Sequence, residues 1–194
     1  MKTTMEYNGV LDSLLSVLSQ GGTMLYPTDT IWGIGCDATN ASAVDKIYDI
    51  KQRDHSKSML ILCSDLAMVE RFVGGVGEEA ARLLLSADRP TTVILPMTLS
   101  RLANNLVASD GSIGVRIPRM EFCQNMLRAF GRPIVSTSAN FSGSPSPSSF
   151  SDIDSNLIAR VDFCVPHYFD RPSAGTSSRI LKLSPSGDIQ ILRP

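Results

Sequence analysis

The sequence has few of the residues on which most metal and nucleophilic sites depend. It contains only two histidines, His55 and His167, which excludes a histidine-rich metal site, and neither stands in a recognisable catalytic frame. The four cysteines lie far apart, with none of the close pairs that zinc ribbons and redox motifs use. We therefore expect the cysteines to be reduced and mostly buried.

Long apolar runs and an excess of one charge are also missing. No window approaches the ~20 apolar residues that a membrane-spanning helix needs, and no signal peptide is visible at the start. Lysine and arginine number 18 against 19 aspartates and glutamates, so the net charge of −1 excludes a polybasic protein. The composition, 43% hydrophobic over 194 residues, fits one large domain. Without a signal peptide or a membrane span, a cytoplasmic protein is expected.

Apolar periodicity alternates between helical and strand spacing along the chain. Helical patterns cover residues 8–20, 41–51, 65–73, 76–87 and 122–130, and strand-length runs cover 23–26, 59–63, 92–95, 113–117, 134–135 and 161–165. Two further strands, 179–183 and 189–192, are expected to form a hairpin that turns at Pro185 to Asp188. The Ser/Pro-rich stretch 142–151 reads as a surface loop. Together these patterns predict a single-domain α/β fold, a twisted mixed sheet with flanking helices.

One glycine-rich segment imitates a dinucleotide-binding motif. Residues 33–38, Gly-Ile-Gly-Cys-Asp-Ala, match G-x-G-x-x-A, and Asp54 lies near the expected offset. In that motif the glycines open a helix, whereas here Asn40 is the better helix cap, and Trp32 would crowd a pyrophosphate. We therefore interpret the segment as a glycine-rich strand or bulge. The P-loop pattern is absent from the sequence.

Three other segments carry groups suited to anions. Residues 51–57 hold three cations after a predicted helix, and these either face a polyphosphate or form a solvated helix end, which is the favoured reading of this segment alone. Residues 136–140, Ser-Thr-Ser-Ala-Asn, are expected at a sheet edge and suit a phosphate or a carboxylate; a serine nucleophile would lack the usual G-x-S-x-G frame. Arg116 interrupts an apolar strand, so it either binds a substrate carboxylate or forms a structural ion pair.

Four motifs, taken in order, resemble those of the YrdC-like threonylcarbamoyl-adenylate synthase family. They are Tyr26 to Cys36 (YPTDTIWGIGC), Lys51-Gln52-Arg53, Gly114 to Pro118 (GVRIP), and Ser136 to Gly143 (STSANFSG) with Pro145-Ser146-Pro147. The resemblance runs from about residue 8 to the end, and it implies a single YrdC-like catalytic domain, residues 1–194, with no additional C-terminal domain of the kind that longer members carry. It implies a YrdC-like α/β fold with a concave basic face. It also implies an enzyme that forms threonylcarbamoyl-AMP and pyrophosphate from L-threonine, bicarbonate and ATP for tRNA threonylcarbamoyladenosine.

The resemblance also implies roles for individual residues. Lys51 and Arg53 are the expected catalytic residues. The expected ATP contacts are Arg53, Lys57, Ser112, Ser138, Asn140, Ser146 and Arg193, and the expected threonine contacts are Thr30, Arg116, Ser136 and Ser178. Threonine's own amine captures the carbon unit and the carbamate attacks the α-phosphorus, so the protein mainly positions reactants and neutralises charge. No metal site is expected in the chain, although Mg²⁺ accompanying the ATP fits this chemistry.

The chain departs from the family pattern at three places, and other functions stay open. Asp54 and His55 follow the Lys-x-Arg where a proline is usual, Leu62 replaces a histidine, and Ser177-Ser178-Arg179-Ile180 replaces Ser-Thr-Val-Val. The alternatives are an RNA-binding protein of the same fold and a nucleotide-binding paralogue with another substrate. Double-stranded RNA or tRNA on the concave face, and proteins that transfer the threonylcarbamoyl group to tRNA, are the expected macromolecular partners; no membrane is expected.

Overall fold

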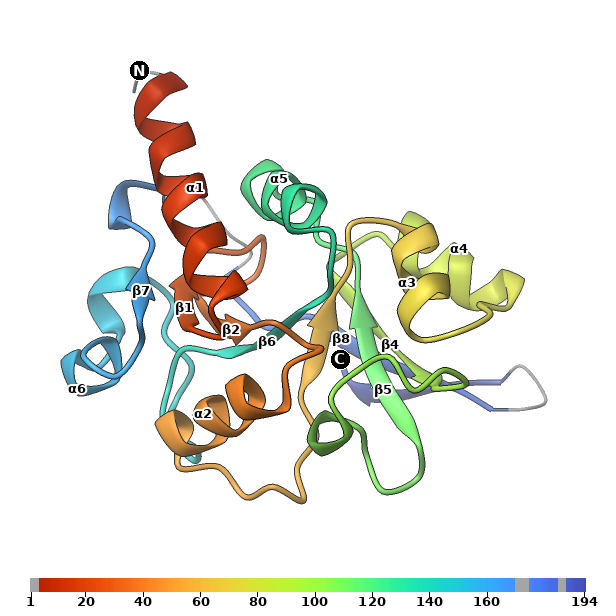
Figure 1. Cartoon of the computed structure of the whole chain (residues 1–194). Helices are drawn as coiled ribbons and strands as arrows, with labels where there is room; N and C mark the ends of the chain where they lie inside the picture. The colour runs from red at the N-terminus through yellow and green to blue at the C-terminus, as the bar shows by residue number, and fades with distance from the viewer. Residues whose placement is uncertain (1–3, 170–174, 185–187) are drawn as a thin grey trace.

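A single mixed sheet organises the part of the chain that the computed structural model describes, residues 4–169, 175–184 and 188–194. Its nine strands lie in the order β7-β1-β2-β6-β3-β5-β4-β8-β9 (Figure 1). The strand bounds are β1 Thr23–Tyr26, β2 Gly33–Cys36, β3 Leu60–Leu62, β4 Thr91–Pro96, β5 Ser112–Arg116, β6 Ile134–Ser138, β7 Phe163–Cys164, β8 Arg179–Leu183 and β9 Ile189–Arg193. The predicted twisted mixed sheet with flanking helices is confirmed.

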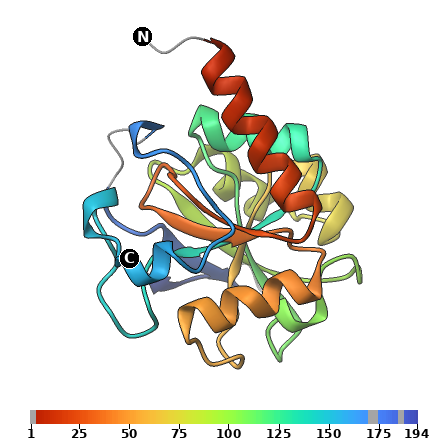
Figure 2. The same ribbon diagram turned by 60° about the vertical axis from the view of Figure 1, so that its left-hand side comes forward.

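Helices cover both faces of this sheet. They are α1 Thr4–Ser19, α2 Ala41–Lys51, α3 Leu66–Phe72, α4 Glu78–Ser86, α5 Glu121–Phe130 and α6 Ser155–Ile158, with short 3-10 turns at Asn104–Leu106, Phe150–Asp152 and His167–Phe169. Figure 2 shows α1 and α2 on opposite sides of the β1–β2 pair. The apolar faces predicted from helical spacing are the buried ones: Leu14 and Leu18 of α1, and Met126 and Leu127 of α5, are at most 1% exposed. Burial of each such side chain contributes about 1.5–3 kcal/mol.

The glycine-rich segment is a strand, as interpreted from the sequence. Gly33 and Gly35 belong to β2, which pairs antiparallel with both β1 and β6. A Cβ atom at Gly35 would lie 2.2 Å from the carbonyl oxygen of Val135, so a residue without a side chain is required for the close approach of β2 to β6. The helix that follows begins at Ala41, where the side chain of Asn40 accepts a hydrogen bond from the Ala43 amide at 3.1 Å.

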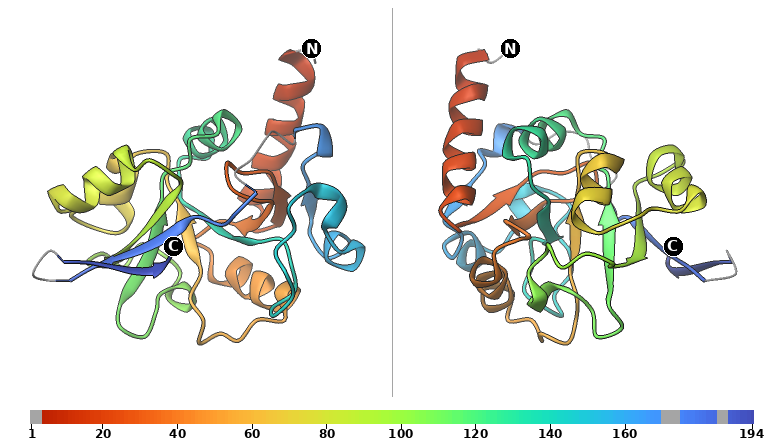
Figure 3. Two further views of the ribbon diagram at one scale, coloured as in Figure 1. Left: turned by 180° about the vertical axis from the view of Figure 1, so that it is seen from behind. Right: turned by 45° about the vertical axis from the view of Figure 1, so that its right-hand side comes forward.

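One predicted location is wrong. The hydroxyl-rich segment was expected at a sheet edge, but β6 continues through Ser138 and lies inside the sheet, between β2 and β3. Hydroxyl side chains are compatible with a central strand here because they face a pocket rather than the apolar core. The predicted hairpin does form from β8 and β9, at the outer edge of the sheet (Figure 3), whereas residues 185–187 of its turn lie outside the described residues.

The cysteine prediction is confirmed. All four cysteines are free, Cys36, Cys63 and Cys123 are buried, and Cys164 is partly buried. Burial raises the pKa of the three buried thiols far above the ordinary value, so they stay protonated and serve as small apolar groups.

Candidate active site

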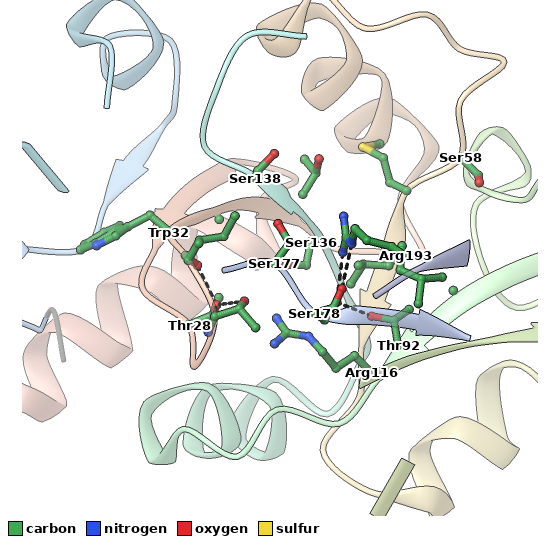
Figure 4. Close-up of a pocket in the computed structure, with 18 of the residues that line it drawn as sticks. Thr28, Trp32, Ser58, Thr92, Arg116, Ser136, Ser138, Ser177, Ser178 and Arg193 are labelled. Carbon is green, nitrogen blue, oxygen red and sulfur yellow. Dashed lines mark hydrogen bonds between the residues drawn. The ribbon is translucent and has the colours of Figure 1, made fainter. Parts of the chain in front are cut away.

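A pocket with three arginines opens over the middle of the sheet (Figure 4). Arg53, Arg116 and Arg193 line it, together with the hydroxyl-bearing residues Thr28, Thr30, Ser58, Thr92, Ser136, Thr137, Ser138, Ser177 and Ser178. Among the described residues, no aspartate or glutamate is part of this lining. Fixed guanidinium groups and hydroxyl donors without a lining carboxylate suit an anionic ligand, such as a phosphate or a carboxylate.

Arg53 is placed by the end of α2. The helix closes at Gln52, whose left-handed backbone (φ 51°) turns the chain so that Arg53 follows on the pocket side. The guanidinium donates to two carbonyl oxygens of its own loop, from Nε to Lys57 at 3.1 Å and from Nη2 to Ser58 at 3.0 Å. The predicted polyphosphate cation is therefore held in place before any ligand binds.

Arg116 forms the structural ion pair that was one of the two predicted roles, and it also lines the pocket. Its Nη1 lies 2.7 Å from Oδ1 of Asp29, with the arginine side chain only 4% exposed, so a buried ion pair is present. The same carboxylate accepts the Arg119 amide at 3.0 Å through Oδ2. Arg116 also lines the pocket, and within the described chain its buried Nε has no hydrogen-bond partner. Asp29 was missed as a site residue, although it lies in the first motif between two threonines.

Ser178 and Arg193 meet at the other side of the pocket. The β8–β9 pairing places Arg193 opposite Ile180, which confirms the expected return of the chain along the terminal hairpin. Arg193 donates from Nε to the Ser178 carbonyl oxygen at 2.8 Å and from Nη2 to Ser178 Oγ at 3.2 Å. Burial lowers the pKa of Arg193, and the nearby charge of Arg116 adds to this effect. An anion bound between the two arginines would relieve that repulsion.

Neighbouring hydroxyl groups hydrogen-bond to the side chains of Ser136 and Thr30 and so orient them. Tyr26 is fully buried and its hydroxyl donates to Ser136 Oγ at 2.8 Å. Burial raises the pKa of Tyr26 far above the ordinary value, so the phenol stays a donor and the hydrogen of Ser136 stays available to a ligand. Thr28 donates to the Ile31 carbonyl oxygen at 2.7 Å, so the 2.8 Å bond between the threonines is donated by Thr30.

Lys51 lies behind the pocket. Its side chain is 1% exposed, and Nζ donates to the carbonyl oxygens of Ser138 and of Asn140, the latter at 2.6 Å. The Lys51 carbonyl oxygen accepts the Ser142 amide at 2.8 Å. Burial, with a smaller contribution from Arg53, lowers the pKa of Lys51 to about 7. Lys51 therefore joins the end of α2 to the loop that follows β6 and does not line the pocket.

The remaining predicted residues are divided between a second pocket and the surface. Asn140 and Ser146 line a neighbouring pocket formed by the loop after β6, where Asn140 donates to the carbonyl oxygens of Phe141 and Ser144. Lys57 is exposed, and Ser112 donates to Asp110 at 2.5 Å. The structure thus gathers Thr30, Arg53, Arg116, Ser136, Ser138, Ser178 and Arg193 in one pocket, and leaves Lys51, Lys57 and Ser112 outside both linings.

The family departures are divided between the pocket and its surroundings: Ser178 and Ile180 of the replaced segment line the pocket, whereas Asp54, Leu62 and Arg179 do not. Leu62 is buried in β3 opposite Arg116 and Ile134, where a leucine suits the apolar core. Arg179 pairs with Asp88 at 3.1 Å. The exposed Asp54 accepts the Ser56 amide at 2.8 Å, and this hydrogen bond lowers the pKa of its carboxyl. Asp54 therefore caps its own turn instead of placing an anion in the pocket.

Metal-ligand clusters and membrane spans were also sought across residues 4–169, 175–184 and 188–194. This part of the chain contains no group of three histidine, cysteine, aspartate or glutamate side chains that could hold a metal ion. None of its helices is long and apolar enough to cross a membrane.

Comparison with known proteins shows the family of this chain. Residues 16–194 match the Sua5/YciO/YrdC family model, which carries the description "Telomere recombination". A threonylcarbamoyl-AMP synthase of Xanthomonas euvesicatoria pv. vesicatoria is 34% identical over 155 residues, which cover 78% of this chain and 82% of the relative. The enzyme of the same name from Stenotrophomonas maltophilia is 35% identical over 155 residues, with 78% and 83% covered.

Solved structures share the fold. P. abyssi Sua5 complexed with L-threonine superposes with a TM-score of 0.86 at 23% identity, covering 97% of this chain. This chain spans about half the length of that protein, 54%. E. coli YciO has a TM-score of 0.77 at 23% identity, with 96% of this chain and 89% of YciO covered. The family predicted from the four motifs is confirmed, and the chain belongs to the Sua5/YciO/YrdC family.

Proposed function

We propose that this chain is a threonylcarbamoyl-AMP synthase, which joins L-threonine, bicarbonate and ATP and releases pyrophosphate. The observation that carries the proposal is the pocket itself, where three arginines and a set of hydroxyl donors converge without a lining carboxylate among the described residues. The names of the relatives, and the fold shared with a Sua5 that binds L-threonine, support the same reaction.

The two ends of the pocket suit the two anionic substrates. Arg53, Ser138 and Arg193 would contact the ATP phosphates, with Lys57 and Ser112 at the margin and Asn140 and Ser146 toward the nucleoside. Arg116 and Ser136 would hold the threonine carboxylate, with Thr30 and Ser178 beside it. Lys51 supports the ATP end indirectly, because its buried Nζ fixes the backbone that carries Ser138 and Asn140.

The reaction itself asks for positioning and charge neutralisation. The threonine amine adds to the carbon of bicarbonate with loss of water, and a carbamate oxygen then attacks the α-phosphorus as pyrophosphate leaves. Negative charge moves from the carbamate onto the phosphate oxygens during this step. Guanidinium groups that are already fixed, as Arg53 and Arg193 are by carbonyl acceptors, stabilise that charge without reorganising.

Mg²⁺ and RNA are secondary to this proposal. No carboxylate of the described residues lines the pocket, so a magnesium ion would enter with the polyphosphate as its ligand. RNA or tRNA contact on the concave face ranks lower, because the lining contains one aromatic side chain, Trp32, on which a base could stack. Proteins that pass the threonylcarbamoyl group to tRNA would consume the product, and a cytoplasmic location remains a prediction.

Product analysis tests the proposal. We expect incubation with ATP, L-threonine and ¹³C-bicarbonate to yield threonylcarbamoyl-AMP carrying the label, as measured by mass spectrometry. L-serine should be a poorer substrate, because loss of one methyl contact in a fitted pocket costs about 1–3 kcal/mol. If ATP binds but no labelled product forms under any of these conditions, the synthase proposal fails and a nucleotide-binding paralogue with another substrate takes its place.

A further inference from the structure

Ser178 occupies the junction between the two proposed substrate ends. It is 4% exposed, and it accepts two hydrogen bonds from Arg193, one at the carbonyl oxygen and one at Oγ. A third bond joins Ser178 Oγ to Thr92 Oγ at 2.8 Å (Figure 4). Thr92 is 1% exposed and comes from β4, which pairs in parallel with β8 so that Thr92 stands opposite Ile180. No motif in the sequence pointed to this threonine.

We propose that Thr92 is a positioning residue that fixes the Ser178 hydroxyl and, through it, the Arg193 guanidinium. This inference rests on the proposed function. A serine hydroxyl has one hydrogen and two acceptor positions. Arg193 fills one acceptor position of the Ser178 hydroxyl. The bond to Thr92 therefore decides where the hydrogen and the second lone pair of that hydroxyl point. If Thr92 donates, the Ser178 hydrogen is left for the substrate. If Ser178 donates, its rotamer is locked toward β4 and its remaining lone pair faces the pocket.

The hydroxyl and the methyl group of Thr92 have different neighbours, so they can be removed one at a time. The methyl group packs on Gly114, where an added Cβ atom would come within 3.2 Å of Thr92 Cγ2. Valine keeps this packing and loses the hydroxyl, whereas serine keeps the hydroxyl and loses the methyl group. Thr91 offers a matched control: it is 5% exposed on the same strand, its Oγ donates to the Arg89 carbonyl oxygen at 2.9 Å, and it is not part of the pocket lining.

Steady-state pyrophosphate release from Thr92→Val, Thr92→Ser and Thr91→Val is the first test. We expect Thr92→Val to lower kcat/KM for ATP and for threonine by about 5–30-fold, the effect of one lost buried hydrogen bond at a reacting site. Thr92→Ser should stay within about threefold of the parent, and Thr91→Val should leave the kinetics unchanged. Equal kinetics in Thr92→Val and Thr91→Val, or equal losses in Thr92→Ser and Thr92→Val, would overturn the proposal.

A second measurement does not depend on the reaction. Thermal unfolding of the ligand-free protein should show coupling between Thr92→Val and Arg193→Ala, so that the Tm loss of the double variant is smaller than the sum of the single losses. Additive Tm losses would contradict the proposed positioning of Arg193 by Thr92 through Ser178. If the parent protein releases no threonine-dependent pyrophosphate, the proposed function fails, whereas this coupling still reports whether Thr92 positions Ser178 and Arg193. If Thr92→Val does not fold, Thr92→Ala and Thr92→Ser are each combined with Arg193→Ala instead, because both lose the methyl group and only Thr92→Ala loses the hydroxyl; coupling in the Thr92→Ala cycle alone is then the expected result.

Discussion

At the scale of single residues, Arg116 shows what burial does to a charge. The sequence indicated that a cation inside an apolar strand needs a partner, and the structure supplies Asp29 at 2.7 Å. Arg116 lines the pocket as well, so the residue that Asp29 stabilises is also the one that we propose for the threonine carboxylate. Asp29 itself could not be predicted as the partner, because the contact joins the end of β5 to the segment between β1 and β2, which only the fold brings together.

Replacement of Arg116 by lysine tests its part in threonine binding. Arg116→Lys keeps a positive charge beside Asp29 but loses the planar fork, so we expect the KM for threonine to rise about 10–100-fold while the KM for ATP changes little. Steady-state pyrophosphate release measures both constants. A variant that melts lower yet keeps the parent's threonine KM would assign Arg116 to the ion pair alone.

Lys51 allows a prediction about pH. Its pKa in the folded chain is lowered to about 7, against an ordinary value of 10.5. Between these values the unfolded chain binds the proton and the folded chain does not, so this residue adds stability as the pH rises through the window. The free energy of unfolding of the parent, relative to that of Lys51→Met, should therefore increase from pH 7 to pH 10 by at most about 1.4 kcal/mol per unit. Chemical denaturation at several pH values gives this difference, and parallel curves for the two proteins would refute it.

At the scale of elements, the regular helices and strands could be predicted and the short ones could not. Periodic apolar positions located α1 to α5, because each of these helices buries one face. Short apolar runs located most strands, several of which, such as β1 and β5, are buried on both faces. Helix α6 has four residues and the 3-10 turn at Phe150–Asp152 has three, too short for a period to show. That turn depends instead on a local capping box between Ser149 and Asp152, a signal that the Ser/Pro-rich composition concealed.

Two glycines in or beside helices should respond to alanine with opposite signs. Gly9 lies within α1 with open space around it, so Gly9→Ala should stabilise the protein by about 0.5–1 kcal/mol. Gly131 ends α5 in the left-handed region (φ 71°), so Gly131→Ala should destabilise it by roughly 1 kcal/mol. Denaturant titration measures both changes. Shifts of the same sign would contradict either the helical position of Gly9 or the left-handed helix end at Gly131.

At the scale of the whole molecule, the sheet order assembles the pocket. Strand β6 lies between β2 and β3, and β8 joins the sheet beside β4, so segments from seven parts of the chain meet at one place. Motif resemblance predicted seven of the pocket residues, but the non-sequential strand order, which brings Thr92 and Asp29 to them, is not visible in local periodicity. The buried position of Lys51 behind the pocket was not predicted either, because it depends on the assembled sheet.

One measurement asks whether this arginine-lined pocket is where ATP reacts with carbamoylated threonine. It is the release of pyrophosphate, compared between the parent protein, Arg53→Ala and Arg82→Ala. The parent should release pyrophosphate only when both L-threonine and bicarbonate are present. Arg53→Ala should lower turnover by on the order of 100-fold, because a fixed cation matters most as charge develops at the α-phosphate. Arg82→Ala, which removes an exposed arginine of α4, should behave as the parent. Release without threonine, or equal turnover in Arg53→Ala and Arg82→Ala, would contradict the account.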